Sequence, residues 1–280
     1  MPMKVTLSVI LIVFTSALGY AQQAPKPEPP HWQGKFEQLD QILPTPNEYR
    51  TGSGSPGPKY WQQQADYIIS GELNDDSQTI TGSETITYTN NSPDALKYLW
   101  MQVDQNINAK DNNTAKVTTS SIKDSLSTKE LATSLSLYDF PGGYNIRSLK
   151  DASGQALTYF VNQTMLRVDL PKPLASGQKF VFQVEWSYKI NDRMHGATPN
   201  DGRSGYEYFP EDGNYLYAVA QWFPRMCVYD DVVGWQNKQF LGRGEFTLPF
   251  GNYKVKLTVP ADHIIAATGS LKNGKDVLTA

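Results

Sequence analysis

The clearest pattern in the chain is an alternation of apolar and polar residues in short runs that end at turn-forming residues. In segment 78–90, QTITGSETITYTN, one face carries Ile80, Gly82, Glu84, Ile86 and Tyr88. Segment 179–190, KFVFQVEWSYKI, repeats the pattern with larger side chains, namely Phe180, Phe182, Val184, Trp186 and Tyr188. Alternation with a period of two predicts β-strands that bury one face.

Other segments extend this pattern to most of the chain. We expect further strands at 96–103, 165–170 and 253–261, with turn residues between them. Segment 110–137 departs from it, because KDSLSTKELATSLSL is suited to a short amphipathic helix inserted between strands. No alternation of strands with helices supports a parallel sheet. The sequence therefore predicts an all-β, antiparallel, sandwich-like domain.

The first residues have the pattern of an export signal. Lys4 precedes the apolar run Val5–Phe14, and small residues follow at the spacing of a cleavage site. This predicts a secretory signal peptide over 1–21. The run is too short to span a bilayer, which takes about 20 apolar residues. We expect an exported protein without a membrane span, in a periplasm, on a cell surface or outside the cell. Residues 22–60 carry three Pro/Gly/Ser clusters and predict an extended linker or arm.

The net charge and the cysteine content limit which partners the protein can have and what can stabilise its fold. Without residues 1–21 the chain keeps 24 basic and 28 acidic side chains, a formal charge of −4, which argues against a nucleic-acid partner. Cys227 is the single cysteine, so an exported chain must rely on a buried core rather than on internal disulfides.

Candidate catalytic chemistry is sparse. A zinc hydrolase site needs three protein ligands and an open position for water. Of the three histidines, His31, His195 and His263, none begins an H-E-x-x-H motif. A metal site at His195 with Asp192 and Asp201 would rest on loose spacing in a polar loop. We therefore expect no catalytic residue and no metal site in this chain.

Two other features have a structural interpretation. Cys227 has no spacing that marks a nucleophile and is read as a small buried hydrophobe. Adjacent carboxylates occur at 75–76, 211–212 and 230–231. Neighbouring acidic residues are common in turns, whereas acid–base catalysis needs pairing in space.

The segment 205–269 carries a specific resemblance. The short motifs in this segment include AQWFPR at 220–225, VYDD at 228–231 and GEF at 244–246. It resembles the end of the amino-terminal domain of bacterial aminopeptidase N-like zinc metallopeptidases, the gluzincin aminopeptidases, and the likeness extends back to Trp61.

The resemblance implies a fold, a partner and a cofactor. Residues 61–270 would form a saddle-shaped β domain that packs in cis on a thermolysin-like catalytic domain. Residues 271–280 would begin the connection to that domain, and zinc would be bound by residues beyond Ala280. The family's Gly-x-Met-Glu-Asn segment is also missing. We therefore expect a truncated chain, inactive by itself, whose parent enzyme removes amino-terminal residues from peptides.

One residue acquires a role through the resemblance. The family places a Gln or Glu of this domain near the amino group of the peptide substrate, ahead of an Arg, a Pro and an Asp. Gln221 is the matching residue, with Pro224, Arg225 and Asp230 after it at a spacing that differs from the commonest form. A neutral amide oxygen can accept a hydrogen bond from an ammonium group.

Aromatic residues concentrate in the same region and leave an alternative function open. Nine of them lie between Tyr206 and Trp235, among Gly, Asp and Pro residues, which suggests a large contact surface carried by loops rather than a core. The alternative is a secreted β-sandwich module that binds glycan or protein.

Overall fold

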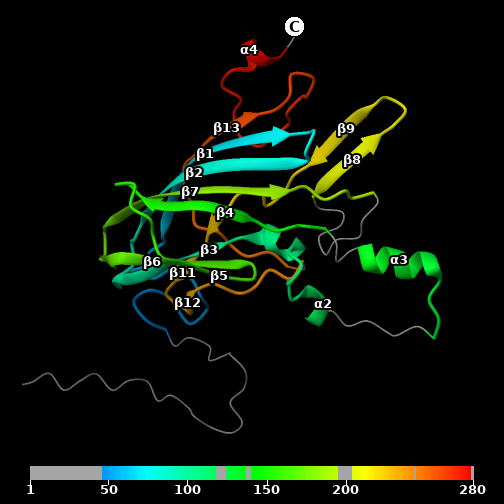
Figure 1. The fold of residues 1–280 in the computed structure, drawn as a ribbon. Helices are drawn as coiled ribbons and strands as arrows, with labels where there is room; N and C mark the ends of the chain where they lie inside the picture. The colour runs from blue at the N-terminus through cyan, green and yellow to red at the C-terminus, as the bar shows by residue number, and fades with distance from the viewer. Residues whose placement is uncertain (1–45, 118–123, 137–139, 195–203, 243, 279–280) are drawn as a thin grey trace, which may run out of the picture. The chain divides into compact units, whose positions relative to one another are not determined.

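The computed structural model describes residues 46–117, 124–136, 140–194, 204–242 and 244–278. They belong to one unit that begins at Pro46. The predicted signal peptide, 1–21, and the first part of the predicted arm lie outside the described residues. Within them strands dominate and the helices are short (Figure 1). The all-β prediction is confirmed.

The larger sheet has five strands. In spatial order they are β13 (Tyr253–Thr258), β1 (Gln64–Asn74), β2 (Thr79–Thr89), β7 (Lys179–Lys189) and β4 (Asn145–Asp151). Neighbours are antiparallel except β13, which runs parallel to β1. β2 and β7 pair without interruption from Thr79↔Lys189 to Thr89↔Lys179. The two segments with the clearest alternation therefore form the middle of this sheet.

The second sheet has four antiparallel strands. They are β10 (Arg225–Met226), β3 (Leu96–Gln102), β6 (Met165–Leu174) and β5 (Tyr159–Asn162). Two small two-stranded sheets complete the domain, β8 (Gly205–Phe209) with β9 (Asn214–Ala218), and β11 (Tyr229–Asp230) with β12 (Gly234–Trp235).

In the described residues, four short helices lie outside the sheets. They are η1 (Asp104–Asn108), α2 (Thr114–Val117), α3 (Thr128–Ser136) and α4 (Gly274–Val277). α3 confirms the helix expected within 110–137. Its start is fixed by a reciprocal pair, because the Glu130 amide donates to Ser127 Oγ (3.1 Å) and the Ser127 amide donates to Glu130 Oε2 (2.9 Å). None of the helices in the described part of the chain is long and apolar enough to cross a membrane.

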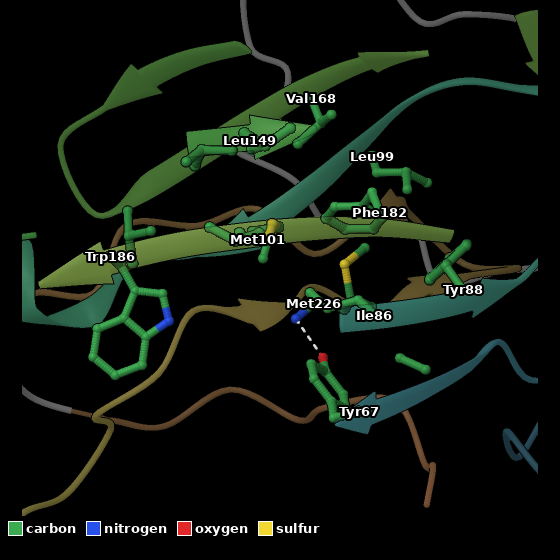
Figure 2. Packing of buried hydrophobic residues seen from close by; sticks show 14 of the residues in the cluster. Tyr67, Ile86, Tyr88, Leu99, Met101, Leu149, Val168, Phe182, Trp186 and Met226 are labelled. Carbon is green, nitrogen blue, oxygen red and sulfur yellow. Dashed lines mark hydrogen bonds between the residues drawn. The ribbon is translucent and has the colours of Figure 1, made fainter. Parts of the chain in front are cut away.

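The core lies between the two sheets. Figure 2 shows side chains from both layers in it, including Ile86 and Phe182 from the larger sheet and Leu99 and Met101 from the smaller one, and all four are completely buried. The backbone amide of Met226 donates a hydrogen bond to the Tyr67 hydroxyl (2.8 Å), which ties β10 to β1 across the core. The burial of alternate residues in β2 and β7 matches the pattern in the sequence.

Two glycines on paired strands make room for two tryptophans. Gly71 in β1 faces Gly82 in β2. A Cβ atom on Gly82 would lie 2.1 Å from a ring carbon of Trp186, and one on Gly71 would lie 2.9 Å from a ring carbon of Trp222. The two indoles meet edge to face at 5.8 Å. The glycine in the alternating pattern of β2 is thus a packing requirement, and it bears on the loop that carries Trp222.

Candidate functional site

Gln221 lies in the loop between β9 and β10, in an unusual backbone conformation. Its φ angle is 52°, in the left-handed region that residues other than glycine seldom adopt. Its carbonyl oxygen accepts hydrogen bonds from the Tyr144 hydroxyl (3.1 Å) and from Gln105 Nε2 (3.3 Å). Gln105 Nε2 also donates to the Ala220 carbonyl (2.9 Å). Such conformations persist where surrounding contacts hold them, and they often mark functional sites.

The residues after Gln221 anchor this loop in the domain. Trp222 packs against Gly71 and meets Trp186, while Phe223 contacts the rings of Tyr67 (5.8 Å) and Tyr253 (6.3 Å). Aromatic pairs at these separations add to the stability that comes from burial alone. The loop therefore presents the Gln221 side chain from a fixed position.

That side chain lines a polar cavity of about 140 Å³. The other lining residues are Gln102, Asp104, Arg225, Phe240, Glu245, Phe246 and Leu248. Four buried polar atoms of this lining have no hydrogen-bond partner within the described part of the chain, and they are Gln221 Oε1, Asp104 Oδ1, Gln102 Nε2 and Arg225 Nε. Leaving a buried polar group unpaired costs about 1–3 kcal/mol. A cavity with two free acceptors and two free donors is suited to a small polar group that both gives and takes hydrogen bonds.

The charges around the cavity are closely coupled. Arg225 Nη2 donates to Asp104 Oδ2 (2.6 Å) and to Gln102 Oε1 (3.1 Å), and the Asp104 side chain is only 1% exposed. Burial raises the pKa of Asp104 above its usual value, although Arg225 beside it opposes the shift and Glu245 adds to it. The acceptors that lack a partner in the described residues, Gln221 Oε1 and Asp104 Oδ1, favour a group that donates hydrogen bonds.

The sequence pointed to Gln221 but not to the rest of this cavity. Gln102 ends β3, whose sequence is mostly apolar, Asp104 follows it, and Glu245 belongs to the GEF motif at 244–246. The signal that could have found them is polar residues directly after such a strand. A buried carboxylate next to a run of apolar residues needs a cationic partner, because charged groups are seldom buried alone.

The histidines do not join this site in the described residues. His263 Nδ1 lies 2.8 Å from Asp262 Oδ1, and its ring packs on Tyr217 at 5.6 Å. His31 and His195 lie outside the described residues. Within the described ranges, no group of three or more His, Cys, Asp and Glu side chains is placed so that it could hold a metal ion.

The geometry agrees with the structural interpretation of Cys227 and of the adjacent carboxylates. Cys227 is completely buried, and burial raises the pKa of its thiol well above the usual value. The carboxylates at 75–76 and 211–212 lie in the turns between β1 and β2 and between β8 and β9. Asp230 accepts from the amides of Val232 and Val233 (both 3.0 Å) at the turn after β11.

The aromatic surface expected over 206–235 is only partly present. Six of the nine pack against the core, so for these six the expected loop-borne surface is wrong: Tyr206, Tyr217, Trp222, Phe223, Tyr229 and Trp235. For the last four of these, the reason is that β10, β11 and β12 fold this part of the chain back onto the two sheets. The exposed aromatic residues are in the β8–β9 hairpin, where Tyr208 is 45% and Tyr215 is 38% exposed.

Comparisons with known proteins give a loose structural likeness. No family model and no curated protein matches the chain. Among solved structures it is similar to a two-domain M1 zinc metallopeptidase variant bound to L-tryptophan, with 13% identity and a TM-score of 0.36, over 79% of this chain and 39% of that one. It is also similar to an M1 zinc metallopeptidase variant from Deinococcus radiodurans bound to a Tyr-Ser-Ala substrate. The identity is 13% and the TM-score 0.34, over 79% of this chain and 39% of that one. The chain thus spans about two fifths of the length of these structures.

Proposed function

We propose that the chain is the non-catalytic amino-terminal domain of an exported zinc metallopeptidase that removes amino-terminal residues from peptides. The observation that carries the proposal is the Gln221 side-chain oxygen, which is buried, has no partner in the described residues, and lines the same cavity as the buried Asp104 carboxyl group. The motif around it, AQWFPR at 220–225, is the part of the sequence that most resembles such enzymes.

The chemistry of the cavity fits the free amino group of a peptide. An ammonium group has three N–H donors, and burying it is costly unless acceptors and negative charge surround it. Gln221 Oε1 and Asp104 Oδ1 are two acceptors without partners in the described residues, and they line one cavity. In this proposal Gln221 receives the ammonium group and Asp104 supplies negative charge, while Arg225 holds Asp104 in place.

Zinc would be bound outside this chain. The described residues offer no set of ligands for it, and in the proposed enzyme a second domain, beyond Ala280, would hold the metal and the water that it activates. This domain's contribution would be to frame the cleft and to orient the amino terminus. The predicted signal peptide, 1–21, supports export to a periplasm, a cell surface or the medium.

An exposed apolar row supports a partner domain in cis. Tyr253, Val255 and Leu257 of β13 continue the inner face of the larger sheet, in register with Tyr67, Ile69 and Gly71. They remain 48%, 46% and 38% exposed, whereas Tyr67 and Ile69 are buried. Contiguous exposed apolar surface of this kind is typical of an interface.

Substitution of Gln221 in the complete enzyme tests the proposal. If its amide oxygen accepts from the substrate's ammonium in both ground and transition states, Gln221→Ala raises KM and changes kcat much less. A hydrogen bond to a charged group contributes about 1.5–3 kcal/mol, so kcat/KM should fall about tenfold to a hundredfold. Gln221→Glu should largely keep activity, because it offers a carboxylate to the same cation.

Melting temperatures and a control separate this from a structural role. Gln62→Ala removes an exposed glutamine side chain whose amide donates to the Tyr60 hydroxyl (2.8 Å), and it should leave KM unchanged. If Gln221→Ala lowers the melting temperature while KM for short peptides stays the same, Gln221 only secures its loop and the proposal fails. An open reading frame without H-E-x-x-H after Ala280 would favour the alternative, a secreted binding module.

A further inference from the structure

The Gln221 cavity has a donor side as well as an acceptor side. Gln102 and Arg225 line the cavity, and Gln102 Nε2 and Arg225 Nε are buried donors without a partner in the described residues. An ammonium group donates hydrogen bonds and accepts none, so it satisfies Gln221 Oε1 and Asp104 Oδ1 but leaves both donors unpaired. Because an unpaired buried donor is costly, the best ligand also carries an acceptor.

The pairing of two strands fixes the direction of the Gln102 donor. Arg225 of β10 lies opposite Gln102 of β3, and its Nη2 atom donates to Gln102 Oε1 (3.1 Å). A guanidinium group has only donors, so the Gln102 amide must turn its oxygen toward Arg225 and its nitrogen away from it. Gln102 is 1% exposed. Its Nε2 donor is therefore held in place within the buried lining of the cavity.

The ion pair beside Gln102 keeps one unused atom at each end. Arg225 Nη2 donates to Asp104 Oδ2 (2.6 Å), whereas Asp104 Oδ1 and Arg225 Nε have no partner in the described part of the chain. A ligand with both an ammonium and a carboxylate group can donate to Asp104 Oδ1 and accept from Arg225 Nε. Such a zwitterion brings no net charge into the buried site, and each of its charges meets a hydrogen-bonding partner, as the burial of a charge requires.

The size of the cavity limits the ligand. Its volume is about 140 Å³. A cavity of about 150 Å³ holds a molecule of about six non-hydrogen atoms, and glycine and alanine are of this size. Phe240, Phe246 and Leu248 supply apolar lining, where the hydrogen atom of glycine or the methyl group of alanine can lie without displacing a hydrogen bond. The cavity therefore fits the smallest α-amino acids.

We propose that the cavity binds free glycine or alanine as the zwitterion, with Gln102 and Arg225 as the residues that bind its carboxylate. This rests on the proposed role of Gln221, which receives the ammonium group. Hydrolysis of a peptide bond creates such a carboxylate, because water adds its oxygen to the carbonyl carbon as the C–N bond breaks. In the complete peptidase the ligand is thus the released amino acid, and it competes with the peptide for Gln221.

Calorimetric titration of the full chain with three small ligands tests the proposal. Glycine carries both charged groups, glycinamide keeps the ammonium group but has a neutral amide, and N-acetylglycine keeps the carboxylate but has no ammonium group. Glycine should bind saturably. Glycinamide should bind at least about tenfold more weakly, because it loses a charge-assisted hydrogen bond and turns an N–H group toward a donor. N-acetylglycine should not bind.

A substitution that reverses the polarity of the donor side completes the design. Gln102→Glu keeps an acceptor for Arg225 but replaces the Nε2 donor by a carboxylate oxygen. This variant should bind glycine at least about tenfold more weakly, and its preference for glycine over glycinamide should disappear. Gln62→Glu introduces the same charge at an exposed glutamine whose amide donates to the Tyr60 hydroxyl (2.8 Å), and it should bind all three ligands as the parent does. Melting temperatures show whether both variants are folded.

The outcomes separate this proposal from the proposed function. Equal binding of glycine and glycinamide by the parent would overturn the carboxylate assignment and leave the ammonium role of Gln221 intact. Absence of binding by both, or equal binding of glycine and N-acetylglycine, would contradict the two together. A folded Gln102→Glu variant that binds glycine as tightly as the parent also refutes the assignment. If that variant does not fold, the three ligands on the parent decide the question.

Discussion

Replacing Gly82 by alanine should strain the centre of the larger sheet. Gly82 lies directly opposite Trp186 in the β2–β7 pair. A Cβ atom there would be 2.1 Å from ring atom Cζ2 and 2.5 Å from two other ring atoms, whereas carbon atoms in contact prefer about 3.5–4.0 Å. The indole would have to move by about 1.4 Å. It is completely buried and held by the rings of Tyr144 (5.6 Å), Tyr188 (6.1 Å) and Trp222 (5.8 Å).

The expected cost follows from two opposing effects. Adding a methyl group to a packed core typically costs about 1–3 kcal/mol. Restricting the unfolded chain, as any Gly→Ala change does, returns about 0.4–1 kcal/mol. Because the required shift exceeds 1 Å and three rings oppose it, we expect Gly82→Ala to reduce the free energy of unfolding by about 2 kcal/mol.

Urea denaturation measures this directly. Gly82→Ala should lower the midpoint with little change in slope, and Ser83→Ala, at the neighbouring exposed position, should stay within about 0.5 kcal/mol of the parent. Trp186→Leu removes the obstructing ring. The double variant should therefore be more stable than the sum of the single effects predicts, by at least about 1 kcal/mol. Strict additivity, or a Gly82→Ala protein as stable as the parent, would refute the packing argument.

Three further predictions concern buried groups. Glu84 is 2% exposed, its carboxyl oxygens have no hydrogen-bond partner in the described residues, and burial raises its pKa well above the usual value. The folded state then holds the proton more tightly than the unfolded state, so stability should fall as the pH rises above about 4.3, and Glu84→Gln should flatten this dependence in denaturation curves. Arg225→Met leaves Asp104 buried without its cation and should cost about 3–5 kcal/mol, and adding Asp104→Leu should recover much of the loss. Cys227, whose thiol is buried with a raised pKa, should react with iodoacetamide only at the rate of unfolding, and rapid labelling of the native protein would contradict its position.

The parts of the fold that could be predicted are those in which local pattern and burial coincide. β2 and β7 alternate cleanly because each has one face on the core and one on solvent, and the sequence identifies them without other information. β13 alternates equally well, yet all six of its residues are exposed. The described residues therefore leave its apolar row exposed. Periodicity indicates a strand and its faces but not what covers them.

The candidate site could not be predicted in the same way because it is assembled by tertiary pairing. β10 is only two residues long and has no pattern of its own, but it pairs Arg225 with Gln102 of β3. That pairing brings the Arg225 guanidinium to Asp104, 121 positions earlier in the chain. Gln221 reaches the same cavity because Trp222 finds space over Gly71, and only the paired strands create that space. The sequence motif identifies the loop, whereas the polar cavity beside it depends on a strand register that no local pattern specifies.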